Sequence, residues 1–221
     1  MSRGPVEEPD LRLADELIFA QRGLRLQRFS PAETGVSRTP DFRVIRAGEA
    51  AAFCEVKSPR DSWLEEQIAA VPPGQNFGGG GPDPVFNRLA RHIQKAAKQF
   101  DAVNQDRLLP NILVLVNHDD GSGYEDLREV LTGTLHAESG TRYITMPHIA
   151  EGLIGHAKRR IDLYAWIDDP PQRPPVRFHF SLVIPAHVTA LCRLLKLPLP
   201  RTEISQGPMV RLRGFDARGN R

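Results

Sequence analysis

Two neighbouring stretches, 42–46 and 51–57, carry apolar residues between polar ones and are separated by Ala47-Gly48-Glu49. Alternation with a period of two is typical of a β-strand that buries one face. A short break containing glycine is typical of a hairpin turn. The pattern therefore predicts a β-hairpin whose second strand ends at Lys57.

The register of this hairpin decides which polar side chains share a face. A three-residue loop sets Arg46 opposite Ala50 and, further along, Asp41 opposite Glu55. Glu55 and Lys57 are two positions apart, so they project from the same face of their strand. A shift by one residue would instead turn Asp41 to the other face. Directly opposed carboxylates repel each other, so the first register favours a hard divalent metal ion between them.

Apolar residues at intervals of three and four predict helices elsewhere. The clearest spans 84–103, with Asp83 before it as its cap. The first helix spans 11–22, with Asp10 as its N-cap and Gly23 as its stop. The remaining predicted helices span 63–71, 124–131, 149–158 and 186–195.

A continuous apolar run at 111–117 predicts a central strand that is buried on both faces. Further strands are predicted at 24–29, 160–167 and 177–184, and we expect the last two to pair at the sheet edge. Up to residue 118 the order is helix, strand, strand, strand, helix, strand. This order predicts an α/β fold.

Pro40-Asp41, a gap, and then Glu55-Val56-Lys57 resemble the signature of the PD-(D/E)XK nuclease superfamily, the fold of many restriction and DNA-repair endonucleases. The αβββαβ element order agrees with that resemblance over residues 11–118. The resemblance implies a restriction-endonuclease-like core, with a mixed central sheet flanked by helices. The later strands and helix would be a C-terminal addition.

The resemblance also implies the chemistry of a metal-dependent DNA endonuclease. Asp41, Glu55 and the Val56 backbone carbonyl would hold Mg²⁺, for which Mn²⁺ can substitute, and Lys57 would help to orient and deprotonate the attacking water. Glu16 on the first helix is a candidate for a further acidic ligand. Duplex cutters of this fold often work as dimers, so a homodimer is among the expectations.

Two other interpretations of the motif stay open. Pro-Asp occurs three times in the chain, whereas an acidic residue two positions before lysine occurs once. Glu55 and Lys57 could be a structural pair on a solvated strand face. The chain could also be a nuclease-like module that no longer cuts and instead binds nucleic acid or another protein.

The polar side of helix 84–103 carries cations at intervals of three or four residues, which suits a phosphate backbone as well as a solvated helix face. These candidate nucleic-acid-binding residues are Arg88, Arg91, Lys95 and Lys98. The glycine-rich segment 74–82 is interpreted as a flap beside the site or as a linker. The basic tail, 201–221, is a flexible arm or disorder.

His118-Asp119-Asp120 follows the central strand. His-Asp pairs ligate metals in phosphohydrolases, but the further ligands of such a site cannot be assigned here. A polar loop at a strand end is the favoured interpretation, with Asp119 or Asp120 able to cap the next helix.

Length and composition limit these hypotheses only weakly. A chain of 221 residues suits one domain at 1–200, with a core at 11–118 and an extension at 119–200. The net charge of +2 permits nucleic acid as a partner without arguing for it. The two cysteines, Cys54 and Cys192, are expected to be buried thiols. No secretory leader or long apolar run is evident, so we expect a cytoplasmic protein with no membrane partner.

Overall fold

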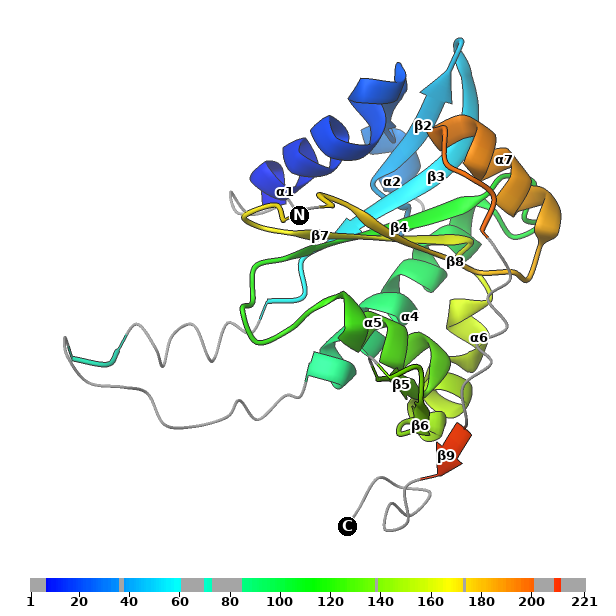
Figure 1. Ribbon diagram of the computed structural model, residues 1–221. Helices are drawn as coiled ribbons and strands as arrows, with labels where there is room; N and C mark the ends of the chain where they lie inside the picture. Colours follow the sequence, from blue (N-terminus) through cyan, green and yellow to red (C-terminus); the bar gives the residue numbers. More distant parts are fainter. Residues whose placement is uncertain are drawn as a thin grey trace.

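The computed structural model describes residues 7–35, 38–60, 70–72, 85–137, 139–172, 174–200 and 209–211. A six-stranded mixed sheet lies at its centre, with helices on both faces (Figure 1). The predicted α/β class is therefore confirmed. Most of the predicted helix 63–71, all of 74–82, and the predicted cap Asp83 lie outside the described residues.

Three parallel strands form the middle of the sheet, and antiparallel strands complete both sides. In spatial order the strands are β1 (Arg25–Arg28), β2 (Phe42–Arg46), β3 (Glu49–Lys57), β4 (Asn111–Asn117), β7 (Leu163–Asp168) and β8 (Arg177–Phe180). β3, β4 and β7 run parallel, whereas β1, β2 and β8 pair antiparallel with their neighbours. The predicted pairing of the last two strands at the sheet edge is confirmed, and both belong to the same sheet as the hairpin.

The helices form two layers. On one face lie α1 (Glu7–Ala14), its continuation through residue 22, and α7 (Pro185–Leu195). On the other lie α4 (Val85–Val103), α5 (Tyr124–Thr132) and α6 (Gly155–Lys158), which follows the π-helical turn His148–Leu153. In Figure 1 the first layer is above the sheet and the second below it.

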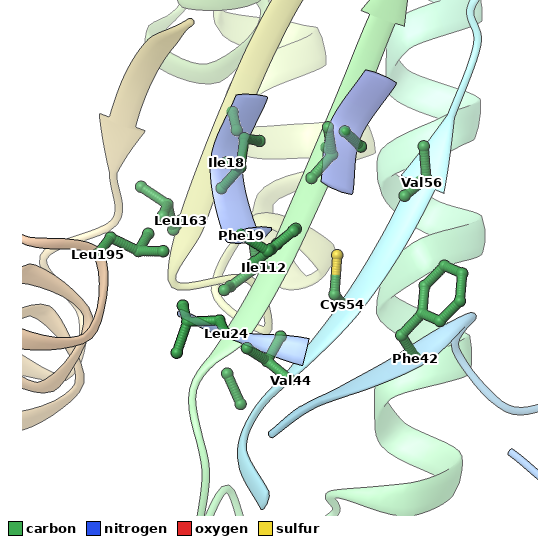
Figure 2. Packing of buried hydrophobic residues seen from close by; sticks show 14 of the residues in the cluster. Ile18, Phe19, Leu24, Phe42, Val44, Cys54, Val56, Ile112, Leu163 and Leu195 are labelled. Carbon is green, nitrogen blue, oxygen red and sulfur yellow. The ribbon is translucent and has the colours of Figure 1, made fainter. Parts of the chain in front are cut away.

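A separate hydrophobic core fills each space between sheet and helices. Figure 2 shows Cys54 and Val56 of β3 on the same face as Ile18 and Phe19 of the first helix. Phe53 faces the other way and packs in the core that α4 forms. Successive side chains of a strand alternate between faces, so Glu55 and Lys57 lie on the α4 face.

The central strand β4 is the clearest success of the hydrophobic pattern. Its bounds, Asn111–Asn117, match the predicted strand, and all seven of its residues are buried. Neighbours on both sides and helices on both faces leave none of its side chains in water, which explains the continuous apolar run.

The hairpin turn differs from the predicted loop. Arg46 pairs with Glu49, so the turn has two residues, Ala47 and Gly48, with φ angles of 51° and 89°. Positive φ at both central positions is the type I′ geometry that matches the twist of paired strands. A register shift between Val44 and Ile45 then adds one residue on β3.

The bulge restores the expected register. From Val44 back to Phe42 the pairs are Val44 with Ala52 and Phe42 with Cys54. Extending this pairing by one residue places Asp41 opposite Glu55. The predicted three-residue loop was wrong, but the register near Asp41 agrees with the one that it implied.

Helical structure begins earlier than predicted at the N-terminal end. α1 starts at Glu7, so Asp10 lies inside the helix and does not cap it. The helix continues as a π-helical turn, Asp15–Phe19, and a 3₁₀ turn, Ala20–Arg22. It ends at Gly23, whose left-handed φ of 70° confirms the predicted stop.

Two local features were absent from the sequence prediction. The loop after β1 contains a short helix, α2 (Pro31–Thr34), which a Ser30–Glu33 capping box begins. A second, three-stranded sheet consists of β5 (Thr134–His136), β6 (Arg142–Ile144) and β9 (Met209–Arg211). β9 belongs to the segment that was interpreted as a tail.

Cys54 and Cys192 are both free and buried, as predicted. Among the described helices, none combines the length and the apolar character needed to cross a bilayer.

Candidate functional site

Asp41 and Glu55 lie beside each other where the β2–β3 hairpin opens. The backbone N–H of Asp41 donates to Glu55 Oε2 at 2.8 Å, and the backbone N–H of Val56 donates to Asp41 Oδ2 at 2.9 Å. Each carboxylate thus holds the strand that carries the other. Both are buried, with exposed fractions of 6% for Asp41 and 0% for Glu55. The structure therefore brings together the two acids that the sequence singled out.

Lys57 completes this group. Its ammonium forms an ion pair with Glu55 Oε1, and its side chain keeps 22% of its surface exposed. A buried carboxylate is costly unless it is paired and hydrogen-bonded, so the ammonium and the Asp41 N–H stabilise the ionised form of Glu55. The partly exposed ammonium connects the buried pair with solvent.

One face of α4 is fixed against this end of the sheet. Arg88, His92, Lys95 and Gln99 follow one another at intervals of four, three and four residues, which places them on one side of the helix. At one end, an Arg88 amino group lies 2.9 Å from Asp119 Oδ2, just beyond β4. At the other end, Gln99 Nε2 donates to the carbonyl of Thr39 at 3.1 Å, two residues before Asp41. His92 and Lys95 lie between these two anchors.

His92 has an unusual electrostatic environment. Burial lowers its pKa, and the charges of Lys57, Lys95, Arg91 and Arg88 lower the pKa further, to about 4. Its Nδ1 is buried and has no hydrogen-bond partner among the described residues. The imidazole is therefore neutral at pH 7 and faces cations from two elements, β3 and α4.

The sequence pattern did not single out His92, which lies on the polar side of its helix. The sequence does contain a relevant spacing, because His92 is four residues after Arg88 and three before Lys95. That spacing places all three on one face, but the approach of Lys57 cannot be read from a helical pattern.

The four candidate nucleic-acid-binding residues of α4 differ in their exposure to solvent. Arg88 is buried, with 6% of its surface exposed, and pairs with Asp119, so it does not belong to the exposed cations of this helix. Arg91, Lys95 and Lys98 are exposed. Their side chains lie on the solvent side of the helix.

Glu16 is not gathered with Asp41 and Glu55. It is exposed and borders a surface hollow together with Glu8, Arg12 and Asp169. Its helix packs on the opposite face of the sheet from Glu55. The structure therefore gives no support to Glu16 as a third acidic ligand.

A second polar cluster lies toward α1 at the same edge of the sheet. His118 Nε2 is 2.8 Å from Asp10 Oδ1, and His118 Nδ1 is 3.0 Å from Asp169 Oδ2. Ser58, directly after β3, donates its hydroxyl to Asp10. The cluster joins α1 to the ends of β3, β4 and β7.

The polar side chains of the loop after β4 also form hydrogen bonds and an ion pair within the protein. Asp119 binds Arg88 and accepts from the Gly121 N–H, while Asp126 accepts from the Gly123 N–H at the start of α5. The prediction that Asp119 or Asp120 caps this helix is wrong. The favoured interpretation of His118-Asp119-Asp120 as a polar loop agrees with this geometry.

Within the part of the chain that the structure describes, no three or more His, Cys, Asp or Glu side chains are grouped so that they could hold a metal ion. A pair of carboxylates is nevertheless a donor set that suits Mg²⁺, which commonly binds proteins through one or two carboxylates and keeps several waters. The pair Asp41 and Glu55 meets that lower requirement.

The chain matched no family model, no curated protein and no solved structure. Its function is therefore inferred from its own residues.

Proposed function

We propose that this chain is a metal-dependent nuclease that hydrolyses phosphodiester bonds in nucleic acid, with DNA as the favoured substrate. The observation that carries the proposal is the convergence of Asp41, Glu55 and Lys57 on one face, where β2 begins and β3 ends. The order α1, β1, β2, β3, α4, β4 adds support. It agrees with the αβββαβ core of the PD-(D/E)XK superfamily that the motif resembles.

The residues divide the work as follows. Asp41, Glu55 and the Val56 carbonyl would hold Mg²⁺. When bound, the ion would lower the pKa of a coordinated water and offset negative charge on the phosphate. Lys57, at the exposed end of the group, would orient the attacking water and stabilise the hydroxide that forms. The exposed cations of α4 would hold the phosphate backbone against this edge.

The test is cleavage of plasmid and linear DNA by purified protein with Mg²⁺ or Mn²⁺, and with EDTA as the metal-free control. Asp41→Asn and Lys57→Met are each expected to reduce the rate at least about 100-fold, because each removes a group acting on the reacting phosphate or water. Glu49→Gln is the matched control, since Glu49 is an exposed acid on the same strand. Cleavage that survives both changes would contradict the proposal.

One observation favours a second candidate function, a nucleic-acid-binding module that does not cut. Both Glu55 oxygens have partners in this chain, the Asp41 N–H and the Lys57 ammonium, as in a closed structural cluster. Calorimetry with Mg²⁺ and binding of DNA at increasing salt would separate the two functions. Salt-sensitive retention without metal binding or turnover would establish the module.

A further inference from the structure

We propose that His92 and Lys95, together with Lys57, form a binding site for one phosphate group. The proposal rests on the proposed function only in naming a nucleic-acid phosphodiester as the natural ligand. Binding of phosphate itself follows from the geometry and does not require that the protein cuts.

The first argument is placement. His92 and Lys95 share one face of α4 with Arg88 and Gln99, and the contacts of those two residues fix the helix at both ends of the site. Lys57 projects from β3 on the sheet face that α4 covers, and its charge acts on the His92 ring. Donors from two elements therefore lie on the same side of the sheet, near His92.

The second argument is charge. Lys57, Lys95, Arg91 and Arg88 all act on the His92 ring, and cations held this close repel one another. Carboxylates compensate part of this charge, with Glu55 bound to Lys57 and Asp119 bound to Arg88. An anion placed against His92 and Lys95 would lower the repulsion among these cations.

The third argument concerns hydrogen bonding. A neutral imidazole carries one N–H and one acceptor nitrogen, so His92 can donate to a phosphoryl oxygen without first gaining a proton. Its buried Nδ1 has no protein partner among the described residues, so the hydrogen-bonding capacity of this ring is not used up by the fold. An ammonium and an imidazole N–H on neighbouring turns can reach two oxygens of one phosphate.

The surroundings favour a polymer over a small enclosed ligand. Arg91 and Lys98 are exposed on α4 beside this site. They would contact neighbouring phosphates of a strand that lies along the helix, and such contacts give binding a steep salt dependence.

The experiment follows the histidine side-chain resonances of ¹³C-labelled protein by NMR during titration with inorganic phosphate, in EDTA and without nucleic acid. The His92→Gln variant assigns the His92 signal. We expect a saturable shift of that signal, and Lys95→Gln should weaken the apparent affinity about fivefold because it removes one charged donor. Arg193→Gln, which removes an exposed cation from α7 on the other face, should leave the affinity unchanged.

His179 supplies an internal control, because it is also half-buried and its pKa is also about 4, yet it lies on β8. The proposal is overturned if the His92 signal does not move, if His179 moves equally, or if chloride at matched ionic strength reproduces the shift. Protein that binds phosphate here but never cleaves DNA contradicts the proposed hydrolysis and leaves this site standing. If the protein cleaves DNA but phosphate does not shift the His92 signal, only the proposed phosphate site is contradicted.

Discussion

Two polar clusters occupy the same edge of the sheet but differ in how they are completed. In the cluster toward α1, both His118 nitrogens face carboxylates, and Asp10 accepts from Ser58 as well. In the cluster toward α4, His92 keeps a buried nitrogen without a partner among the described residues and faces four cations.

The comparison shows that residue type alone does not identify a binding site. Both clusters contain histidine and aspartate, and both lie beyond the parallel strands where α/β proteins commonly bind ligands. The α1 cluster satisfies its own donors and acceptors and connects four segments, so it serves the architecture. In the α4 cluster four cations act on His92, and a bound anion would lower their mutual repulsion.

The largest expected effect tests whether the α4 cluster also depends on internal pairing. Lys57→Met leaves Glu55 buried without its ammonium, which should lower the free energy of unfolding by about 3–5 kcal/mol. Glu55→Gln combined with Lys57→Met removes both charges and should recover most of that loss. Urea unfolding measures both. If Lys57→Met alone were as stable as the native protein, the Glu55–Lys57 ion pair would contribute little to the free energy of unfolding.

The next effect tests the structural role of the α1 cluster. Asp10→Ala removes the acceptor of Ser58 and His118 and should cost about 2–4 kcal/mol in the free energy of unfolding, because buried hydrogen bonds to a charged group are lost. Phosphate affinity at the α4 cluster should remain within about twofold. Glu8→Ala is the control, since Glu8 forms an exposed pair with Arg28 that is worth less than about 1 kcal/mol. A loss of phosphate binding without a loss of stability would reverse the assigned roles.

The smallest effect concerns protonation of His92. In the native protein its pKa should be about 4, and removal of the Lys57 charge should raise it, because Lys57 is the first of the neighbouring cations that lower it. Burial should still keep the value below the ordinary 6.5. NMR titration of the Glu55→Gln/Lys57→Met double variant measures this change, with His179 as the unchanged reference. An unaltered His92 pKa would mean that Lys57 does not face the ring.

The sign of the linked stability change follows from the lowered pKa values of His92 and His179. Unfolded histidine takes up a proton near pH 6.5, whereas the folded side chains resist protonation until about pH 4. Their contribution is therefore present in full above pH 6.5 and is lost as the pH falls through this range. Unfolding by acid should therefore begin between pH 6.5 and about pH 4.

Local patterns predicted the elements better than the contacts between them. The run 111–117 and the helix 84–103 were recognised because the burial of each repeats along its own sequence. β5, β6 and β9 have three residues each, and β9 pairs with residues more than sixty positions earlier, so no local period marks them. The burial of Arg88 depends on Asp119, which reaches it from beyond β4.

Only the part of the candidate site that lies within one local element could be predicted. Asp41, Glu55 and Lys57 belong to one hairpin, and strand alternation placed them together. His92 gains its character from an ammonium on β3 that approaches the helix only after folding. Glu16 could not be excluded from the pattern, because either face of the sheet could have received its helix.

The β-bulge in the hairpin has a consequence for how this chain can change in length. The thirteen positions between Asp41 and Glu55 include the two residues of the tight turn and Ala51, the extra residue of the bulge. Loss of Ala51 alone would remove the bulge and give a regular ladder, in which Val44 still pairs with Ala52 and Asp41 still lies opposite Glu55. The ribbon can therefore lose this residue without separating the two acids, whereas a slip of the whole ladder by one residue would turn Asp41 to the other face.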